Sequence, residues 1–492
     1  MSTRRDLIRI SKKLYALSAE AEIERLLKAV LPPSPFSGKV FAVGGYVRDQ
    51  VMGSEAKDLD VVIEGKDGAK SFVNWLKKTF PEQTTSPRQL GAGYPIWQIV
   101  FKGNVVFKGE EFKTAGGEVE AADSQKESFP DESSRQRVTE PGTIKDDIER
   151  RDFTVNMLLK DLSSGDLVDL TGTSVSDIKN GILRGHPGVN FQKILRDDPL
   201  RSLRLVRFQS KYGWKVPLSV IRDVRANAER ISIVSAERIR EELVKIMKAG
   251  KLAQAVRFMS VTGLLKHILP EIEALRGVSQ KNAHGWHAEG DVLKHTLMVL
   301  RNAKPGVESQ MAALLHDVGK PSTQESFGEF FRFKGHDKAG AEIAEAMMRR
   351  MKFDNATTLK VKKMVESHMR PLSLIDGEAS AKSIRKFVRA VGEELVGAVL
   401  DLAEADALGT LPSRNDIPDL RGKIEDAMKS TPVSEKPILD GKEVMDVLGI
   451  KPGKDVGRAK DLVREIMDEA ADKGGVLTKE EAKQVLKRKW SS

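Results

Sequence analysis

Residues 40–64 read VFAVGGYVRDQVMGSEAKDLDVVIE, and this stretch decides the fold of the chain around it. It begins with a short apolar run typical of a β-strand, which stops at Gly44 and Gly45. Two glycines after a strand permit positive φ angles and a close backbone approach, as a phosphate-binding loop requires. We predict a short helix at 47–52, ended by Gly53, whose first N–H groups would add to an anion site.

Two aspartates introduce the second apolar run of this stretch. Residues two apart on a strand point to the same face, so Asp58 and Asp60 are expected to converge. Two neighbouring carboxylates repel each other, which raises one pKa, and a Mg²⁺ ion with its preference for oxygen ligands relieves that repulsion. The alternative is a turn aspartate followed by an unrelated aspartate at a strand edge. The glycine pair and Arg48 upstream favour the metal site.

The sequences GGYVRD and KDLDVVI within this stretch resemble the first motif of the class II tRNA nucleotidyltransferase and bacterial poly(A) polymerase family. That family has a head similar to DNA polymerase β. The resemblance implies an α+β fold, in which a small mixed β-sheet head precedes an all-helical neck, an HD domain and a helical tail. It also implies that Asp58 and Asp60 hold catalytic Mg²⁺, while Gly44, Gly45 and Arg48 hold a nucleoside triphosphate.

The composition limits the class of protein. The chain has 492 residues, enough for roughly three or four domains. We see no apolar run near the roughly 20 residues that cross a bilayer and no signal peptide, so we expect a cytoplasmic protein without a membrane partner. The absence of cysteine excludes disulfides and thiolate metal sites, so any metal must use Asp, Glu or His. A net charge of +10 suits an RNA partner without requiring one.

The motifs and composition predict five segments along the chain. The expected segments are an N-terminal helical extension (1–35), the nucleotidyltransferase head (36–184), a helical neck with a nucleotide-reading helix (185–275), an HD metal-dependent phosphohydrolase domain (276–412) and a C-terminal helical tail (413–492). In the N-terminal extension, apolar residues recur at helical spacing between positions 6 and 31, which predicts one helix without a chemical role.

The later part of the head contains two strand-like runs, at 94–101 and 105–107. Family members often carry a further acidic residue on a strand here, and Glu110 and Glu111 are the candidates for a third metal ligand. Residues 114–143 are rich in small and polar residues, so we expect a mobile loop beside the active site. By resemblance, such a loop helps the enzyme change from adding C to adding A; a simple insertion is the alternative.

A second motif in the head is RRDFTVN, at residues 150–156. Adjacent arginines beside an aspartate are usually a solvated surface, but apolar residues alternate here and anchor the segment in a core. The planar guanidinium of arginine forms paired, charge-assisted hydrogen bonds with phosphate. The motif resembles a second motif of the same family. The resemblance implies that Arg151 holds the triphosphate, while Asp152 and Asn156 order the ribose side of the site.

The third motif is RDDPLRSLRLVRF, at residues 196–208. A proline fits the first turn of a helix, and Asp198 and Arg201, three residues apart, are expected to share one helix face. An ordinary capped helix is the alternative. Cytosine and adenine both show an amine donor beside a ring-nitrogen acceptor, so one carboxylate and one guanidinium can select C and A against U and G. The segment resembles the E-D-x-x-R motif of the family, with Asp197 replacing the usual Glu, and Arg204 joins the same nucleotide site.

Histidines are concentrated in the second half of the chain, with six of eight between residues 284 and 368. The sequences GDVLKHT, LLHDVGK and GHD resemble the HD phosphohydrolase domain, in which a His, a His-Asp pair and a distant Asp bind a divalent metal. The matching residues are His295, His316, Asp317 and Asp406, with His336 and His368 as candidates to complete a two-metal site. Imidazole ligands favour Ni²⁺, Co²⁺ or Mn²⁺ over Mg²⁺. A lone His-Asp pair would be structural, but the ordered set favours metal binding.

The resemblance spans roughly residues 36–485 and implies an enzyme that adds C, C and A to the 3′ end of tRNA. CTP and ATP would be the substrates, and no nucleic-acid template would be needed. A poly(A) polymerase or a partial enzyme that adds only CC or only A remains open. A rival from another class is an HD phosphohydrolase whose head only binds RNA, against which the intact head motifs argue. The oligomeric state and the HD substrate stay undetermined by the sequence.

Overall fold

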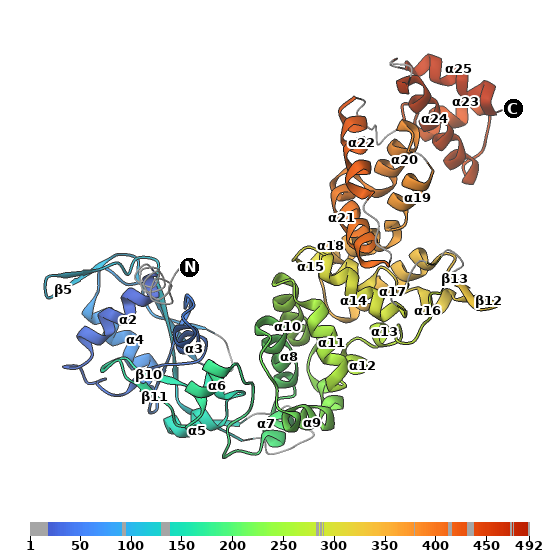
Figure 1. Cartoon of the computed structure of the whole chain (residues 1–492). Helices are drawn as coiled ribbons and strands as arrows, with labels where there is room; N and C mark the ends of the chain where they lie inside the picture. The colour runs from blue at the N-terminus through green and yellow to red at the C-terminus, as the bar shows by residue number, and fades with distance from the viewer. Residues whose placement is uncertain are drawn as a thin grey trace, which may run out of the picture. The chain divides into compact units, whose positions relative to one another are not determined.

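The computed structural model describes residues 18–90, 95–128, 138–281, 285, 288, 290–377, 379–411, 416–430, 437–472, 475 and 477–490. The chain divides into two compact units, which are described separately below. The first unit comprises Met1–Ser235 with Val261–His267, and the second comprises Ala236–Ser260 with Ile268–Ser492. Strands lie mainly in the first unit, whereas the second is built almost entirely from helices (Figure 1). Among the described residues, no helix is long and apolar enough to cross a membrane.

A mixed β-sheet forms the frame of the first unit. Among the described residues it has seven strands in the order β11-β10-β1-β2-β7-β4-β3. Strand β2 pairs with β7 in parallel, and the other neighbouring pairs are antiparallel. The strands are β1 (Val40–Ala42), β2 (Leu59–Ile63), β3 (Arg88–Leu90), β4 (Ile96–Val100), β7 (Glu118–Asp123), β10 (Leu159–Asp161) and β11 (Leu167–Val168). The predicted α+β fold with a mixed-sheet head is confirmed.

Two amphipathic helices pack on the strands of the first unit. Helix α4 (Gly68–Thr79) packs on β4 and β7 and buries Phe72 and Leu76 completely. Each such side chain contributes about 1.5–3 kcal/mol by leaving water. Helix α2 (Ala19–Val30) packs on β7 and begins at Ser18, whose hydroxyl accepts a hydrogen bond from a main-chain N–H of the first turn. The prediction placed this helix at 6–31, and its earlier part falls outside the described residues.

The segment 114–143 contains strands, so the expectation of a loop throughout it is wrong. Strand β7 lies in the middle of the sheet, and β8 (Gln125–Ser128) pairs with β9 (Val138–Pro141) in a hairpin. Val119 and Ala121 of β7 are fully buried and alternate with acidic residues. The polar composition concealed this period-two pattern, which is the signature of a half-buried strand. Residues 129–137 of the expected loop lie outside the described residues.

The remaining elements of the first unit connect the sheet to a group of helices. Helix α3 starts at Gly45, the second glycine of the pair and two residues earlier than predicted, and it ends at Gly53 in the left-handed conformation, as predicted. The further elements are α3 (Gly45–Met52), β5 (Val105–Phe107), β6 (Glu110–Phe112), α5 (Ile144–Glu149), the 3-10 turn η1 (Thr154–Asn156), α6 (Ser174–Asn180), α7 (Phe191–Asp197), α8 (Leu200–Tyr212), α9 (Leu218–Ala226) and the 3-10 helix η2 (Ala228–Ile233).

In its described residues, the second unit is a series of packed helices with one short hairpin. Within it α14 packs on α15 and α21, and α17 packs on α18 (Figure 1). Helices α11 and α12 each have residues in both units. The elements from residue 236 onward are α10 (Ala236–Lys248), α11 (Leu252–Thr262), α12 (Leu265–Ile268), α13 (Pro270–Glu273), α14 (Val292–Asn302), α15 (Val307–Leu315), α16 (Lys320–Thr323), β12 (Glu325–Phe327), β13 (Phe330–Arg332), α17 (His336–Arg350), α18 (Asn355–Ser367), α19 (Arg370–Asp376), α20 (Ala381–Val391), α21 (Glu393–Gly409), α22 (Ile417–Ser430), α23 (Gly441–Leu448), α24 (Lys454–Asp472) and α25 (Lys479–Trp490).

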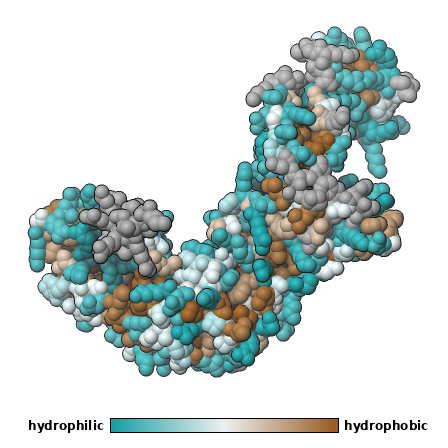
Figure 2. All heavy atoms as spheres, viewed as in Figure 1, coloured by the Kyte–Doolittle hydropathy of each residue, from teal (hydrophilic) through white to brown (hydrophobic). Residues whose placement is uncertain are grey.

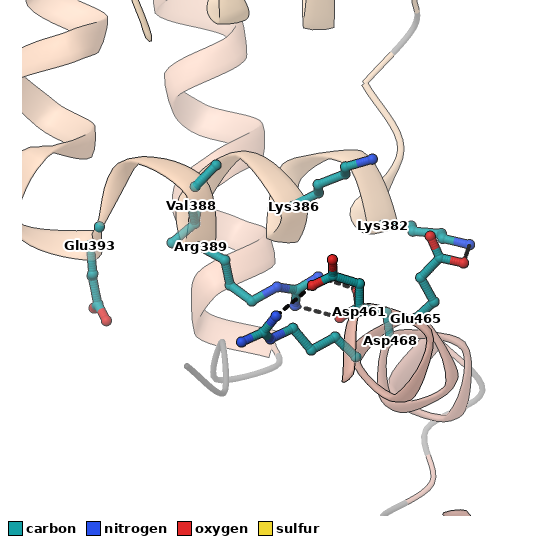
Figure 3. Close-up of a pocket in the computed structure, with 11 residues that line it drawn as sticks. Lys382, Lys386, Val388, Arg389, Glu393, Asp461, Glu465 and Asp468 are labelled. Atoms are coloured by element: carbon teal, nitrogen blue, oxygen red, sulfur yellow. Dashed lines mark hydrogen bonds and ion pairs between the residues drawn. The ribbon is translucent and has the colours of Figure 1, made fainter. Parts of the chain in front are cut away.

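Buried ion pairs join helices α20 and α24. Asp468 accepts hydrogen bonds from Arg385 Nε at 3.0 Å and from Arg389 Nη1 at 2.8 Å. A pocket of about 570 Å³ opens beside these ion pairs (Figure 3). Its charged lining residues are Lys382, Lys386, Arg389, Arg464, Glu393, Asp461, Glu465 and Asp468. Because acidic and basic side chains balance, the pocket offers no net attraction for a phosphate, and we read it as a gap in helix packing.

Candidate functional site

Two carboxylates lie on the neighbouring strands β2 and β7, and a third directly precedes β2. Asp60 on β2 is opposite Glu120 on β7, and Asp58 directly precedes β2. Burial raises the pKa of Asp60 to about 6, helped by the charges of Glu120 and Asp58, and Arg151 offsets only part of this effect. A carboxylate whose pKa is raised by burial and by neighbouring negative charges, as that of Asp60 is, is a ligand that a hard divalent cation stabilises. The structure thus brings Asp58 and Asp60 together, with Asp58 just outside the strand.

Glu120 is the acidic neighbour of this pair, whereas Glu110 and Glu111 lie elsewhere. Both of these residues are on β6, which pairs with β5 in a separate hairpin. The expectation that one of them supplies the third carboxylate is therefore wrong. The alternation of acidic and apolar residues along β7 was the signal that would have found Glu120.

The glycine pair turns the chain from β1 into α3 beside these carboxylates. Gly44 has a φ of 71°, in the left-handed region that favours glycine. A Cβ atom at this position would lie 3.8 Å from Arg151 Nη1 and 4.0 Å from Asp60 Oδ2. A phosphate bound to the backbone of Gly44 and Gly45 would therefore lie beside both the carboxylates and the arginine.

Arg151 is positioned at this site by a buried acid. Its Nε and Nη2 atoms donate to Asp147 Oδ2 at 3.1 and 2.8 Å. The side chain of Asp147 is 1% exposed and that of Arg151 is 22% exposed. Although burial opposes it, the charges of Arg151 and Arg150 lower the pKa of Asp147, which keeps it ionised. Arg151 thus has a fixed direction and retains access to solvent.

Arg48 is buried, and its guanidinium is engaged within the protein. Its Nη1 and Nε atoms donate to Asn156 and Asp49, each at 2.8 Å. The guanidinium carbon also lies 5.3 Å from the Phe208 ring centroid and 5.5 Å from that of Tyr212. These contacts support a role in holding α3 against α8, in contrast to the expected direct contact with a triphosphate.

Asp152 connects the second motif to helix α8. It accepts hydrogen bonds from Asn156 Nδ2 at 3.1 Å and from Arg204 Nε at 2.7 Å. Burial alone would raise the pKa of Asp152, but the charge of Arg204 and the bond from Asn156 lower it. The predicted residues Arg48, Asn156, Asp152 and Arg204 therefore form one continuous hydrogen-bonded chain.

Asp198 and Arg201 lie at the junction of α7 and α8. Asp198 is in extended conformation before α8, and its side chain accepts a hydrogen bond from the Leu200 N–H at 3.3 Å. Because Asp198 lies outside the helix, the prediction that it shares a helix face with Arg201 is wrong. Arg201 is buried within α8 and donates to the carbonyl oxygens of Ile194 at 3.0 Å and Arg150 at 2.8 Å. Two of its N–H groups are thus committed to the backbone, which fixes the direction of the guanidinium.

Glu127 is a residue of this region that the sequence analysis missed. It lies on β8, and its side chain is 4% exposed. It accepts a hydrogen bond from Arg150 Nη1 at 2.6 Å, and its other oxygen lies 3.9 Å from Arg201 Nη2. No local motif marks Glu127, because only the tertiary fold brings β8 to helix α8.

Six potential metal ligands converge in the second unit. They come from α14, from the ends of α15 and α18, from the start of α17 and from α21. The residues are His295, His316, Asp317, His336, His368 and Asp406, all of which are buried. The structure brings together every residue that the HD resemblance had singled out, in two groups that can each hold an ion.

The first group has the spacing of ligands around one ion. His295 Nε2 lies 3.2 Å from His316 Nε2 and 3.0 Å from Asp406 Oδ1. His316 Nε2 lies 3.2 Å from Asp317 Oδ2. Two ligands at roughly 2.05 Å from a tetrahedral ion are about 3.3 Å apart, so these residues fit a shared divalent cation.

The second group shares Asp317 with the first. Its Oδ1 atom lies 3.3 Å from His336 Nε2, which lies 3.2 Å from His368 Nε2. Because Oδ2 faces the first group and Oδ1 the second, Asp317 is placed to bridge two ions. Although burial opposes it, the charges of His316 and Lys320 hold the pKa of Asp317 well below its usual range.

Backbone carbonyls fix the tautomer of three of these histidines. The Nδ1 atoms of His316, His336 and His368 lie 2.9, 2.8 and 2.7 Å from the carbonyl oxygens of Ala313, Phe333 and Val365. A carbonyl only accepts, so Nδ1 carries the proton and Nε2 presents its lone pair to the centre of the cluster. Burial, with the neighbouring His316 and His336, lowers the pKa of His368 to about 4, which keeps it neutral for ligation.

Family models match three parts of the chain. Residues 40–184 match the model described as Poly A polymerase head domain. Residues 217–275 match the probable RNA and SrmB-binding site of polymerase A, and residues 292–411 match the HD domain. The fold and these matches define the class as a nucleotidyltransferase with an appended HD domain.

The chain is similar over most of its length to named tRNA nucleotidyltransferases. It is 32% identical to the CC-adding tRNA nucleotidyltransferase of Thermus thermophilus, covering 70% of this chain and 77% of that one. It is 30% identical to the A-adding tRNA nucleotidyltransferase of Deinococcus radiodurans, covering 94% and 97%. The Thermotoga maritima CCA-adding enzyme complexed with tRNA has the same fold, with a TM-score of 0.57 at 19% identity over 97% of this chain and 98% of that one. The chain belongs to the tRNA nucleotidyltransferase family, and the predicted enzyme class is confirmed.

Proposed function

We propose that this protein adds C, C and A from CTP and ATP to the 3′ end of tRNA. The observation that carries the proposal is the Asp58, Asp60 and Glu120 cluster beside the Gly44 turn and Arg151. The proximity of the Gly44 turn, Arg151 and Asp60 supports a phosphate-binding site next to a divalent-cation site, which is what nucleotidyl transfer requires. We assign this chemistry to a head at 36–184, followed by a neck, an HD domain and a tail with the boundaries given above.

The reaction exchanges one phosphorus–oxygen bond for another. The 3′-oxygen of tRNA bonds to the α-phosphorus, the bond from that phosphorus to pyrophosphate breaks, and the 3′-hydroxyl loses its proton. Mg²⁺ held by Asp58, Asp60 and Glu120 would supply activation of the nucleophile and charge compensation at the leaving group. The Gly44 turn and Arg151 hold the triphosphate in line with the attacking oxygen.

Base choice belongs to the junction of α7 and α8. Asp198 accepts from the exocyclic amine of C or A, and Arg201 donates to the adjacent ring nitrogen. The backbone bonds of Arg201 fix the plane of its guanidinium before the nucleotide arrives. Asp152 and Asn156 orient the ribose side, with Arg204 held by Asp152.

A partial enzyme is the second candidate, because two similar relatives are named CC-adding and A-adding. The β8–β9 hairpin favours the complete reaction, since Glu127 connects it to Arg150 and Arg201. By its resemblance to the nucleotidyltransferase family, this part of the head is expected to help the enzyme change from adding C to adding A. A polymerase that makes poly(A) is the remaining alternative.

The test uses purified protein with tRNA transcripts that end at the discriminator base, after one C or after two. Each labelled nucleoside triphosphate is supplied alone and then in mixture. We expect two C additions followed by one A and then a stop. Arrest after CC, or A addition only to the CC-ended transcript, would instead identify a partial enzyme, and long A tails would identify a poly(A) polymerase.

The HD cluster is proposed to hold two divalent transition-metal ions, such as Ni²⁺, Co²⁺ or Mn²⁺, and to hydrolyse a phosphate ester. The support is the set of imidazoles whose Nδ1 atoms face backbone carbonyls, so that Nε2 is directed inward, together with the shared carboxylate of Asp317. Imidazole-rich sites prefer these ions to Mg²⁺. Metal analysis of the protein after dialysis against each ion tests the proposal, and two ions per chain is the expected result.

A further inference from the structure

The hairpin formed by β12 and β13 presents aromatic rings to solvent in the second unit. Phe327 and Phe330 are paired across the two strands, so their rings lie on one face, and Phe327 is 49% exposed. The Arg332 guanidinium lies 4.5 Å from the Phe327 ring centroid, and Lys281 Nζ lies 5.5 Å from that of Phe330. Figure 2 shows hydrophobic and hydrophilic atoms side by side at the place of this hairpin.

The hairpin is joined directly to the HD cluster. The residue after β13 is Phe333, whose carbonyl oxygen lies 2.8 Å from Nδ1 of the cluster residue His336. Lys320 Nζ lies 5.4 Å from the Phe333 ring centroid and 2.6 Å from Asp317 Oδ2. The main-chain N–H of Phe331 also donates to the carbonyl of residue 281 at 2.9 Å, which ties the hairpin to the segment before α14. The base of the hairpin, at Phe333, thus adjoins groups that can bind a phosphate ester through metal ions, and the hairpin continues from there to Phe330 and the more exposed Phe327.

A two-stranded hairpin gains little stability from aromatic side chains that stay in contact with water. Exposed rings with cations on the same face are, in contrast, the groups on which nucleobases stack. Glu329 pairs with Lys281, so the net charge of the face is small and stacking must supply the affinity. The occupant that fits a base platform beside a phosphate-ester site is a nucleotide.

We propose that Phe327 and Phe330 form a nucleobase-stacking subsite for the substrate of the HD cluster. The substrate class is a nucleotide phosphate ester, either a free nucleotide or the end of a single-stranded RNA. The inference rests on the proposed phosphohydrolase function for its catalytic part, but base stacking is measurable without catalysis.

The test measures binding of adenosine 5′-phosphate and of base-free ribose 5-phosphate by calorimetry, in wild type and in Phe327→Ala/Phe330→Ala. We expect the double variant to lose at least fivefold in affinity for the nucleotide and to bind ribose 5-phosphate unchanged, as loss of a stacked base predicts. Phe327→Tyr/Phe330→Tyr retains aromatic faces and should restore binding. Leu359→Ala is the matched control, since Leu359 is 55% exposed on α18 of the same unit and should not alter either affinity.

Hydrolysis of adenosine 3′-phosphate with Mn²⁺ adds a second readout, in which KM should rise at least fivefold while kcat stays constant. A short oligoadenylate with a 3′-phosphate distinguishes a free nucleotide from an RNA end as the ligand. If the oligoadenylate binds more tightly than the mononucleotide does, the subsite is assigned to an RNA end. Equal binding of nucleotide and ribose 5-phosphate by wild type, or unchanged nucleotide binding by the double alanine variant, overturns the proposal. If wild type hydrolyses no ester but shows aromatic-dependent nucleotide binding, the subsite stands and the phosphohydrolase function fails.

Discussion

Asp60 is a half-buried carboxylate under the influence of the charges of Glu120 and Asp58, and its pKa of about 6 lies above the ordinary value of 3.8. Between these pH values the folded, metal-free protein binds more protons than the unfolded chain, so stability falls as the pH rises through this window. Above pH 6 the folded protein has lost all of the stability that the protonated Asp60 contributes. We expect Asp60→Asn to stabilise the metal-free first unit at pH 7.5 by about 1–2 kcal/mol, after allowing for solvent screening.

Thermal unfolding with and without Mg²⁺ measures this effect. The Tm of wild type should rise when Mg²⁺ is added, and that of Asp60→Asn should respond much less. At pH 4 the advantage of the variant should disappear, because Asp60 is then protonated in the folded state. An equal Mg²⁺ response in both proteins would remove Asp60 from the metal site.

Arg201→Ala should relax base selection. Losing a charge-assisted hydrogen bond in a closed site costs about 1.5–3 kcal/mol, so UTP or GTP should enter at a 10- to 100-fold larger fraction of the CTP rate. Arg204→Ala is a useful control, because Arg204 pairs with Asp152 and should affect nucleotide affinity more than selectivity. If Arg201→Ala retained full preference for C and A, the base reader would have to lie elsewhere.

At the residue scale, functional residues that lie close together in the sequence could be predicted from their motifs. Gly44, Asp58 and Asp60 lie within one short stretch, so their juxtaposition follows from a strand, a turn and a strand. Glu120 and Glu127 escaped notice because their neighbours come from distant segments. For Arg48 the motif predicted a role that its contacts do not support. Its position in the motif suggested a phosphate ligand, whereas its hydrogen bonds are with protein groups.

At the scale of elements, Asp468 is the contact that fastens α24 to α20. Its side chain is 5% exposed and that of Arg385 is 4% exposed, so removing the acid takes away the carboxylate that compensates a buried cation. We expect Asp468→Ala to destabilise the second unit by about 3–5 kcal/mol. Denaturant unfolding measures the change, and Asp461→Ala, whose side chain is 73% exposed, should alter stability by less than about 0.5 kcal/mol. Similar stability of both variants would show that this ion pair is dispensable.

Elements with a clear apolar period were predicted well, and those in polar segments were not. Strands β4 and β5 appear where the apolar runs at 94–101 and 105–107 predicted them. Strand β7 was hidden, because glutamates occupy its solvent-facing positions within a segment of loop-like composition. Helix α8 starts at Leu200, directly after Pro199, as the proline predicted, but the extended Asp198 lies outside it and so does not share a helix face with Arg201.

At the scale of the whole molecule, the two candidate sites use ligands from separate units. Every head residue from Gly44 to Arg201 belongs to the first unit, and the HD cluster belongs to the second. We therefore expect His316→Ala/Asp317→Ala to abolish metal-dependent hydrolysis of p-nitrophenyl phosphate and of a 2′,3′-cyclic nucleotide. Nucleotide addition to tRNA in Mg²⁺ should stay within about twofold of wild type, since no head ligand is altered.

Hydrolysis should be faster with Ni²⁺, Co²⁺ or Mn²⁺ than with Mg²⁺, as imidazole ligands require. Loss of nucleotide addition in a folded double variant would show that the two sites are coupled. If wild type hydrolysed neither substrate with any of these ions, the cluster would instead have a structural role.

The order of functions along the chain was predictable because each motif is local and the motifs follow one another in sequence. The HD ligands are the exception, since they are spread from His295 to Asp406 and only the packing of helices brings them together. Their identity came from resemblance to a family pattern, while the bridging position of Asp317 required the structure.

The central claim is that the Asp58, Asp60 and Glu120 cluster performs nucleotidyl transfer to tRNA. The most direct measurement is single-turnover addition of labelled CMP to a tRNA transcript that lacks its CCA end, in wild type and in Asp60→Ala, with tRNA binding followed in parallel. We predict that Asp60→Ala binds tRNA with unchanged affinity and adds no detectable nucleotide. Addition at the wild-type rate by this variant would contradict the account.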